Sequence, residues 1–257
     1  MIKIDNLSFF FEETKIFFEN LNLLIRDGII TSIIGPNGSG KSTLLNLLAR
    51  ILSPRCGSIL IDKMDISRLS RKDIAKKLSI IFQQNYAPED LTVRELLSFG
   101  RNPHKKYFDN LVIEDVKLIE WAMKVTRITH LSERRLSQLS GGEKQRVWLA
   151  VGLVQNTRYL LLDEPTTYLD IRYQIEFLNL IRKINKEFGL TVIMVLHDIN
   201  QAIKYSDSII VINQGKIVAC GEPSKVITQE LLINVFGIRS KLIEDNGEYY
   251  FVFQETV

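Results

Sequence analysis

The stretch GPNGSGKST, Gly35 to Thr43, lies between an apolar run, Ile29 to Ile34, and a leucine-rich stretch, Leu44 to Leu52. It fits the pattern G-x-x-x-x-G-K-[ST], in which backbone N–H groups turn inward around phosphate oxygens and the next helix adds its dipole. The β-branched run predicts a buried parallel strand, and the leucine spacing predicts a helix that Pro54 closes. Strand, glycine loop and helix in this order predict a phosphate-binding loop, called here the phosphate loop (residues 35–43).

Two side chains of the phosphate loop carry its expected chemistry. Lys41 would reach the β and γ phosphates of a nucleotide, and the Ser42 hydroxyl would ligate Mg²⁺. An ordinary glycine turn is the alternative interpretation. The strand and helix predicted on either side of the loop argue against it.

The remaining pattern predicts an α/β fold with a mostly parallel sheet, an N-terminal antiparallel β layer and a helical insertion. Residues 2–26 alternate as antiparallel strands, and Asn246-Gly247 marks a hairpin turn between two further strands. We expect a single domain over residues 1–257. Its predicted parts are a core with the β layer (1–84 and 157–236), a helical subdomain (85–156) and a C-terminal β-hairpin (237–257). Strands are predicted in GSILID, LSIIFQQ, YLLLDEP, LTVIMVLHD and SIIVINQG, and helices over Leu91–Phe99, Ile113–Val125 and Ile171–Phe188.

Composition excludes several other classes of protein. The formal net charge is +3, and 46% of the residues are hydrophobic, which indicates a globular protein and gives no sign of a nucleic-acid binder. Cys56 and Cys220 are far apart in sequence, so a disulfide framework or zinc site is not expected. The N-terminus has no signal-peptide pattern, and no apolar run approaches the roughly 20 residues of a membrane span.

Polar residues follow three of the predicted parallel strands. Asp163 and Glu164 end YLLLDEP, where ligands bind in open α/β sheets, so Asp163 would hold Mg²⁺ and Glu164 would polarise the attacking water. A solvated turn is the alternative for this pair. His197 and Gln83 end two other strands and are candidate phosphate-site residues, although a structural histidine and a surface glutamine are the alternatives.

A second anion-binding segment is predicted at LSGGEKQR, Leu139 to Arg146, called here the signature segment. Ser140, Gly141 and Gly142 offer backbone N–H groups at the start of a helix. A plain N-cap followed by two glycines is the alternative, and it explains Ser140 but not the whole string.

Taken in order, these motifs resemble the ATP-binding subunit of ABC transporters, a P-loop NTPase with a RecA-like core. GPNGSGKS resembles the Walker A motif, Gln83 the Q-loop, LSGGE the signature motif, LLLDE the Walker B motif, TTYLD (Thr166 to Asp170) the D-loop and His197 the switch histidine. The resemblance implies ATP hydrolysis with Glu164, His197, Lys41 and Gln83 as catalytic residues and Mg²⁺ held by Ser42, Gln83 and Asp163. It implies that ATP contacts Gly35, Pro36, Asn37, Gly38, Ser39, Gly40, Lys41, Ser42, Thr43, Ser140, Gly141, Gly142, Glu143 and Asp170.

The resemblance also implies an aromatic residue that stacks on adenine. Phe11 is the candidate, with Phe9 and Phe10 as alternatives. Thr167 and Tyr168 depart from the Ser-Ala that is common in the D-loop of this family, which could alter dimer contacts.

The same resemblance implies partners. A second copy would pack head to tail, so that each ATP lies between one phosphate loop and the other copy's signature segment. Transmembrane permease subunits, and through them a substrate-binding protein, would place the chain peripherally on the cytoplasmic side of the inner membrane, with no nucleic acid as partner. Tyr86, Leu91 and Phe99 are candidates for the permease contact, and RNPHKK, Arg101 to Lys106, either faces anionic lipid or is a solvated loop.

Two longer stretches, Leu91–His104 and His197–Pro223, resemble bacterial importers of iron-siderophore, haem and cobalamin-type chelates. Importers of molybdate-like oxyanions remain an alternative. Two other hypotheses are a soluble ATPase of iron-sulfur cluster assembly and a nucleotide-binding regulator without hydrolysis. The intact Asp163, Glu164 and His197 argue against the regulator.

Overall fold

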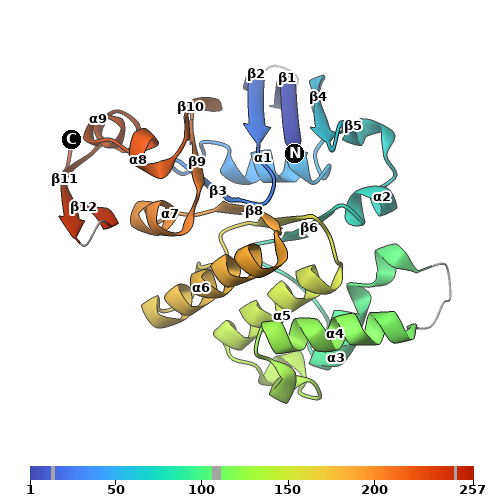
Figure 1. The fold of residues 1–257 in the computed structure, drawn as a ribbon. Helices are drawn as coiled ribbons and strands as arrows, with labels where there is room; N and C mark the ends of the chain where they lie inside the picture. Colours follow the sequence, from blue (N-terminus) through green and yellow to red (C-terminus); the bar gives the residue numbers. More distant parts are fainter. Residues whose placement is uncertain (13–14, 106–110, 246–247) are drawn as a thin grey trace. The chain divides into compact units, whose positions relative to one another are not determined.

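A computed structural model describes residues 1–12, 15–105, 111–245 and 248–257 (Figure 1). Its contacts divide the chain into two compact units. The first unit comprises residues 1–68 and 192–257, and the second unit comprises residues 69–191. Each is described by itself.

An antiparallel sheet opens the first unit. Its strand order is β2-β1-β4-β5, with β1 Ile2–Glu12, β2 Lys15–Ile25, β4 Cys56–Ile61 and β5 Met64–Asp65. Ile2 pairs with Ile25 on one side and with Ile61 on the other, and all three side chains are buried. The predicted N-terminal β layer is therefore confirmed.

The parallel strands of the first unit surround β3, Ile30–Ile34, whose five residues are all buried. It pairs in parallel with β8, Thr191–Val195, and with β9, Ser208–Asn213. The strand β10, Lys216–Gly221, adds to β9 in the antiparallel direction and was not predicted. It follows a tight turn in which Gln214 and Gly215 both have positive φ, a turn geometry that favours hairpins.

The first unit also holds the helix after the phosphate loop. This helix, α1, runs over Lys41–Leu48 and is shorter than the leucine spacing predicted. Arg50 adopts a left-handed φ of 54°, which ends the helix, and Ile51 is 53% exposed. The other elements of this unit are η1 Ile66–Arg68, α7 Ile199–Tyr205, α8 Pro223–Val226, α9 Gln229–Leu231, η5 Leu232–Phe236, β11 Ile238–Asp245 and β12 Glu248–Thr256.

The two C-terminal strands pair antiparallel, from Ile238 with Thr256 to Asp245 with Glu248. The two residues predicted to form the turn between these strands, Asn246 and Gly247, lie outside the described residues. The amide of Asn200 in α7 exchanges two hydrogen bonds with the backbone of Phe251 in β12. Phe251 is 3% exposed, so the hairpin is fastened to α7 within its own unit.

The second unit joins two parallel strands to a group of helices. The strands are β6, Leu78–Ile81, and β7, Tyr159–Leu162, and Ile81 pairs with Leu162. Among the described residues between β6 and β7, one isolated β-bridge forms, between Thr92 and Arg135. The helices of the unit are α2 Arg71–Ala75, α3 Val93–Phe99, η2 Asn102–His104, α4 Ile113–Val125, η3 Thr129–Leu131, η4 Leu136–Gln138, α5 Gly141–Val154 and α6 Ile171–Phe188. Figure 1 shows α3, α4 and α5 lying together.

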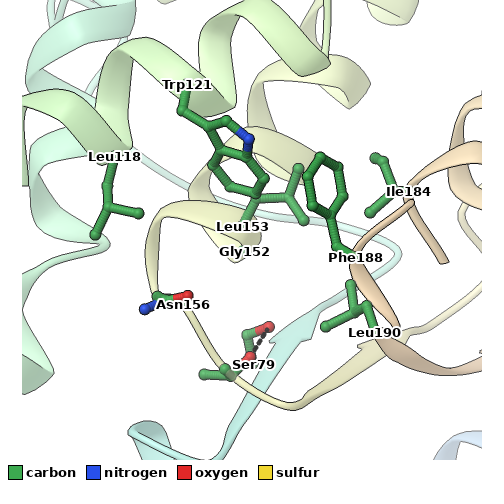
Figure 2. Close-up of a pocket in the computed structure, with 10 residues that line it drawn as sticks. Ser79, Leu118, Trp121, Gly152, Leu153, Asn156, Ile184, Phe188 and Leu190 are labelled. Carbon is green, nitrogen blue, oxygen red and sulfur yellow. Dashed lines mark hydrogen bonds between the residues drawn. The ribbon is translucent and has the colours of Figure 1, made fainter. Parts of the chain in front are cut away.

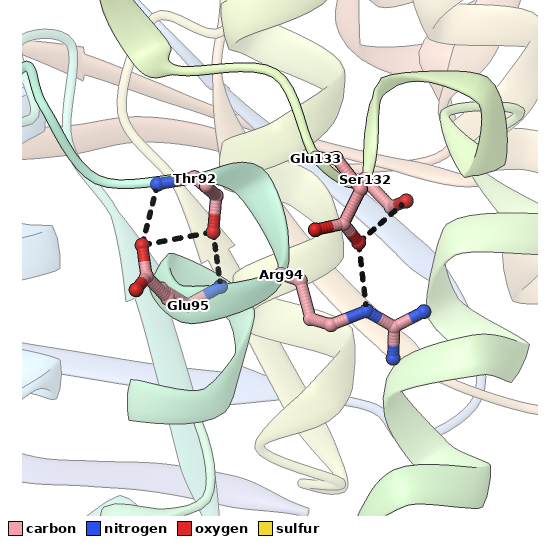
Figure 3. Close-up of polar contacts among 5 residues, drawn as sticks. All are labelled: Thr92, Arg94, Glu95, Ser132 and Glu133. Atoms are coloured by element: carbon pink, nitrogen blue, oxygen red, sulfur yellow. Dashed lines mark hydrogen bonds and ion pairs between the residues drawn. The ribbon is translucent and has the colours of Figure 1, made fainter.

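Polar contacts fix the start of α3. The Thr92 hydroxyl accepts from the Glu95 N–H at 3.2 Å, while the Glu95 carboxylate accepts from the Thr92 N–H at 2.8 Å. Figure 3 shows both contacts. This capping box satisfies N–H groups that have no partner within the helix. Arg94 donates to Glu133 at 3.3 Å, which ties α3 to the loop before α5.

A buried ion pair ties α4 and α5 to the segment after α3. Arg101, 7% exposed, donates to Asp115 at 2.7 Å and to the carbonyl of Val154 at 2.9 Å. Burial alone would raise the pKa of Asp115, but the hydrogen bonds from Arg101 and from the Val112 N–H, with the arginine charge, hold it below its usual value. The interpretation of residues 101–106 as a lipid-facing or solvated basic cluster is therefore wrong for Arg101, and Lys106 lies outside the described residues.

These elements confirm the predicted α/β class, with mostly parallel strands, an antiparallel layer and a helical region. The predicted subdomain boundaries stay a prediction. Within the described ranges, no helix combines the length and the apolar character that crossing a bilayer requires.

Candidate functional site

The phosphate loop connects β3 to α1 inside the first unit. Gly35 and Gly40 have φ of 154° and 114°, which side chains other than hydrogen rarely allow. A Cβ on Gly35 would lie 2.0 Å from the carbonyl oxygen of Ile212, and one on Gly40 would lie 2.8 Å from the rings of Phe17 and Phe18. Surrounding backbone and aromatic rings therefore dictate glycine at both positions.

Polar groups line this loop with little access to water. Lys41 is 5% exposed, and its ammonium donates to the carbonyls of Gly35 at 2.9 Å and Pro36 at 3.0 Å. The hydroxyl of Ser39 is buried and has no hydrogen-bond partner among the described residues. A buried polar atom of this kind indicates a ligand or water.

The start of α1 adds backbone donors to the loop. Its N-cap is Gly40, which offers no side chain to the first N–H groups of the helix. Those groups carry the positive end of the helix dipole and suit a phosphate. Ser42 and Thr43 are half-buried in the first turn, while Asn37 and Gly38 are exposed. The loop therefore fits the phosphates of a nucleotide.

Three phenylalanines of β1 have different surroundings. Phe9 is 6% exposed and belongs to the core, and the ring of Phe10 lies 5.2 Å from the Arg55 guanidinium. Phe11 is 59% exposed and is held edge-on by Phe9 and Phe17, at ring separations of 5.0 and 4.9 Å. Of the three, Phe11 best combines exposure with a fixed ring.

His197 also lies in the first unit. It follows the buried strand β8 and is itself exposed, directly before Asp198, whose carboxylate accepts from the Gln201 N–H at 2.9 Å to cap α7. The cap fixes the turn on which the imidazole is carried.

The carboxylates predicted after β7 lie in the second unit. Asp163 is 9% exposed, and its N–H donates to the carbonyl of Ile81 at 2.9 Å. Glu164 adopts a left-handed φ of 49°, an uncommon conformation for this residue type. Gln83 donates from Nε2 to Oε2 of Glu164 at 2.7 Å, so two residues predicted from separate strands meet at one point.

A third residue contacts the same carboxylate. The hydroxyl of Thr167 donates to Oε2 of Glu164 at 3.2 Å. Sequence reasoning identified Thr167 as a departure from the D-loop pattern and missed this contact. The signal in the sequence was the position of Thr167, three residues after Glu164. In the structure the two residues share a turn, which is closed by a 3.2 Å hydrogen bond from the Thr167 N–H to the Glu164 carbonyl.

The signature segment begins α5 with a capping box. The Ser140 hydroxyl and N–H each donate to Glu143 Oε2 at 2.8 Å, and the Ser140 oxygen accepts from the Glu143 N–H at 3.4 Å. The hydrogen bonds from the Ser140 N–H and hydroxyl hold the pKa of Glu143 below its usual value. The N-cap of the alternative interpretation is therefore present. The N-cap residue Ser140 and the following Gly141 are nevertheless exposed.

The signature segment contacts two other parts of the second unit. Gln145 donates to the carbonyl of Pro165 at 2.9 Å, just after the paired carboxylates. A Cβ on Gly142 would lie 3.2 Å from the ring of Tyr173 in α6. Helix α6 itself is capped by Asp170, whose carboxylate accepts from the Tyr173 N–H at 3.1 Å. Gln145 was a further residue that sequence reasoning did not single out.

The candidates for a permease contact differ in exposure. Tyr86 is 86% exposed and Phe99 is 49% exposed, whereas Leu91 is half-buried. The packing alternative therefore holds best for Leu91.

Comparison with known proteins extends this picture. Residues 18–167 match the ABC transporter family. The petrobactin import ATP-binding protein FpuC of Bacillus anthracis is 43% identical over 251 residues, which make up 98% of this chain and 92% of that protein.

Two solved structures are similar as well. One, an inward-facing conformation of a protein assigned to the metal-chelate type of ABC transporter, gives a TM-score of 0.85 at 26% identity, covering 99% of this chain and 97% of the other. The ATP-binding cassette MJ0796, a dimer in a post-hydrolysis state with ADP and Pi, gives 0.73 at 31% identity, covering 87% and 99%. The chain therefore belongs to the ABC transporter family, as one of its ATP-binding and ATP-hydrolysing subunits.

Proposed function

We propose that this subunit powers the import of iron-siderophore, haem or cobalamin-type metal chelates through a permease. Support for the cargo class comes from similarity to a petrobactin import protein and to a transporter assigned to the metal-chelate type. The observation that carries the chemistry is the carboxylate of Glu164, held by Gln83 at 2.7 Å beside the buried Asp163.

In the proposed site, Lys41 and the backbone N–H groups of the phosphate loop bind the β and γ phosphates. Phe11 offers a ring face to adenine. His197 contacts the γ-phosphate, and Glu164 orients the attacking water and accepts its proton. The hydrogen bonds from Gln83 and Thr167 keep the Glu164 carboxylate in one place, so that it need not be ordered during the reaction.

The hydroxyl of Ser42, the amide oxygen of Gln83 and the carboxylate of Asp163 are hard oxygen ligands of the kind that Mg²⁺ prefers. When bound, the ion neutralises charge on the phosphate oxygens.

The second copy completes the site in this proposal. The exposed Ser140 and Gly141 of one copy, with the half-buried Gly142, would cover the phosphates held by the other. Glu143 and Asp170 would keep both helix starts in place. Dimeric cassettes among the similar structures support dimerisation. The permease would hold the dimer at the cytoplasmic face of the inner membrane, with Tyr86 and Phe99 toward it. A substrate-binding protein on the far side of the membrane would be a partner only through the permease.

Replacing Glu164 by glutamine tests the chemistry. Glu164→Gln should keep ATP affinity within about threefold and lower turnover by about 100-fold or more, because the base is lost while the phosphate contacts remain. Glu120→Gln, an exposed carboxylate of α4, is the matched control and should hydrolyse ATP like the wild type. Wild-type turnover in Glu164→Gln would refute the role.

Growth tests the cargo separately. In a strain lacking this chain, the wild-type gene should restore growth on an iron chelate and Glu164→Gln should not. Co-purification from native membranes should recover a permease. An active ATPase that supports growth on no iron or corrin chelate, and binds no membrane protein, would move the function to the soluble iron-sulfur cluster ATPases.

A further inference from the structure

A cavity of about 380 Å³ lies within the second unit, apart from the residues discussed above. It is formed by α4, the last turns of α5 and α6, and the start of β6. Its size falls within the range of small-molecule pockets, about 300 to 1,000 Å³, and most of its wall is aliphatic or aromatic, as in such pockets.

One end of the cavity is aromatic. The rings of Trp121 and Phe188 meet edge to face, with centroids 5.0 Å apart and planes at 85° (Figure 2). Phe188 is 46% exposed, and Trp121 is half-buried, so both rings have surface that no other side chain covers. Flat ring systems pack well on such surfaces.

The other end is polar and accepts hydrogen bonds. Ser79 is 2% exposed, and its hydroxyl oxygen lies 3.1 Å from that of Thr157. The carbonyl oxygen of Tyr159 lies 2.9 Å from the Thr157 hydroxyl and 3.5 Å from the Ser79 hydroxyl, so it can accept from either of them. Each hydroxyl has one proton and two lone pairs, so whichever of the two donates, at least one lone pair of Ser79 remains for a ligand donor.

Among the residues that the structure describes, those that line the cavity carry no charge. An ionised ligand would therefore lose its hydration without gaining an oppositely charged partner. We propose that this cavity binds a neutral aromatic molecule of two fused rings that carries one N–H or O–H donor, with the rings against Trp121 and Phe188 and the donor on Ser79. Asn156 at the same polar end provides an amide that can pair with a second polar group.

Binding can be measured on the full chain without nucleotide, so its outcome is independent of the ATPase site. The probe is 5-fluoroindole, followed by ¹⁹F NMR titration. Saturable binding is expected, together with a rise in melting temperature, because the ligand binds the folded state. 1-Methyl-5-fluoroindole, which lacks the donor, and 5-fluoroindole-3-acetate, which is charged, should each bind at least tenfold more weakly.

Variants locate the site. Leu118→Trp fills the cavity from α4 and should abolish saturable binding, while Lys117→Trp, on the exposed neighbouring position of the same helix, should leave it unchanged. If Leu118→Trp does not fold, Ser79→Ala serves instead, since it should remove the preference for 5-fluoroindole over its N-methyl form. No saturable binding by the wild type, equal affinity for the three probes, or unchanged binding in Leu118→Trp would overturn the proposal.

Discussion

The phosphate loop and the signature segment both present glycine and serine at the start of a helix, but they differ in how their own unit surrounds them. In the phosphate loop, Ser39 and Lys41 are 4% and 5% exposed, and a Cβ on Gly35 would collide with backbone. In the signature segment, Ser140 and Gly141 are exposed, and a Cβ on Gly141 would meet no atom within 4 Å.

The reasons for glycine at positions 35 and 141 are therefore different. Glycine at position 35 is required by the chain's own packing, so it would be required in an isolated subunit. At position 141 the second unit leaves ample space, so any need for glycine there must come from something that approaches from outside. A phosphate held by a second copy is the occupant that the proposed dimer supplies.

Gly35→Ala should give the largest effect, because both the φ of 154° and the 2.0 Å approach to the Ile212 carbonyl oppose a side chain. The free energy of unfolding should fall by about 3 kcal/mol or more. Gly38→Ala is the matched control, with φ of 74° and open space around its Cβ, and should cost about 1 kcal/mol. Urea unfolding measures both, and equal losses would contradict the steric argument.

Lys41→Ala should come next. Loss of a charge-assisted contact of about 1.5–3 kcal/mol should weaken ATP binding by about 10- to 100-fold, with turnover falling in parallel. Lys216→Ala, which removes an exposed lysine of the same unit, is the control in equilibrium binding with a fluorescent ATP analogue. Unchanged affinity in Lys41→Ala would refute its phosphate contact.

Gly141→Glu tests whether something anionic approaches the signature segment. An acidic residue in the first turn of α5 suits the helix dipole, so the folded subunit should be no less stable than the wild type. Hydrolysis should nevertheless fall at least tenfold, because the carboxylate would repel the phosphate of the other copy. Gly141→Ala separates size from charge, and full activity in Gly141→Glu would show that nothing anionic approaches this position.

Glu143→Gln should have the smallest effect. The pKa of Glu143 is held low by the hydrogen bonds from Ser140, so the folded state favours the charged form. The resulting stability is present at neutral pH and is lost as the pH falls below about 4. Since Glu143 is partly exposed, the loss at pH 7 should stay below about 1 kcal/mol. Unfolding measured from pH 3 to 7 should show a flatter profile for the variant than for the wild type.

The sequence predicted those helices and strands whose apolar residues recur at a regular spacing. Helix α6 has the predicted bounds, Ile171–Phe188, because a long amphipathic pattern begins at a capping aspartate and ends at a left-handed Gly189. The end of α1 could not be predicted, since the leucine spacing continues while Arg50 turns left-handed. Strand β10 was missed although Gln214-Gly215 marks its turn.

Pairings between distant residues were the other limit. The contact of Gln83 with Glu164 follows from two parallel strands ending side by side, so both residues could be selected in advance but not their hydrogen bond. The burial of Arg101 against Asp115 depends on how the segment after α3 packs between α4 and α5, which no local pattern records. Such contacts require the tertiary structure.

The most direct test of the shared site mixes the two impaired variants, Lys41→Ala and Gly141→Glu, in equal amounts. In a head-to-tail dimer, a mixed pair combines the intact phosphate loop of one chain with the intact signature segment of the other. Random pairing then gives about a quarter of the wild-type sites, and ATP hydrolysis should recover to about that fraction. Activity no greater than the sum of the two separate variants would contradict the claim that each ATP is bound by two copies.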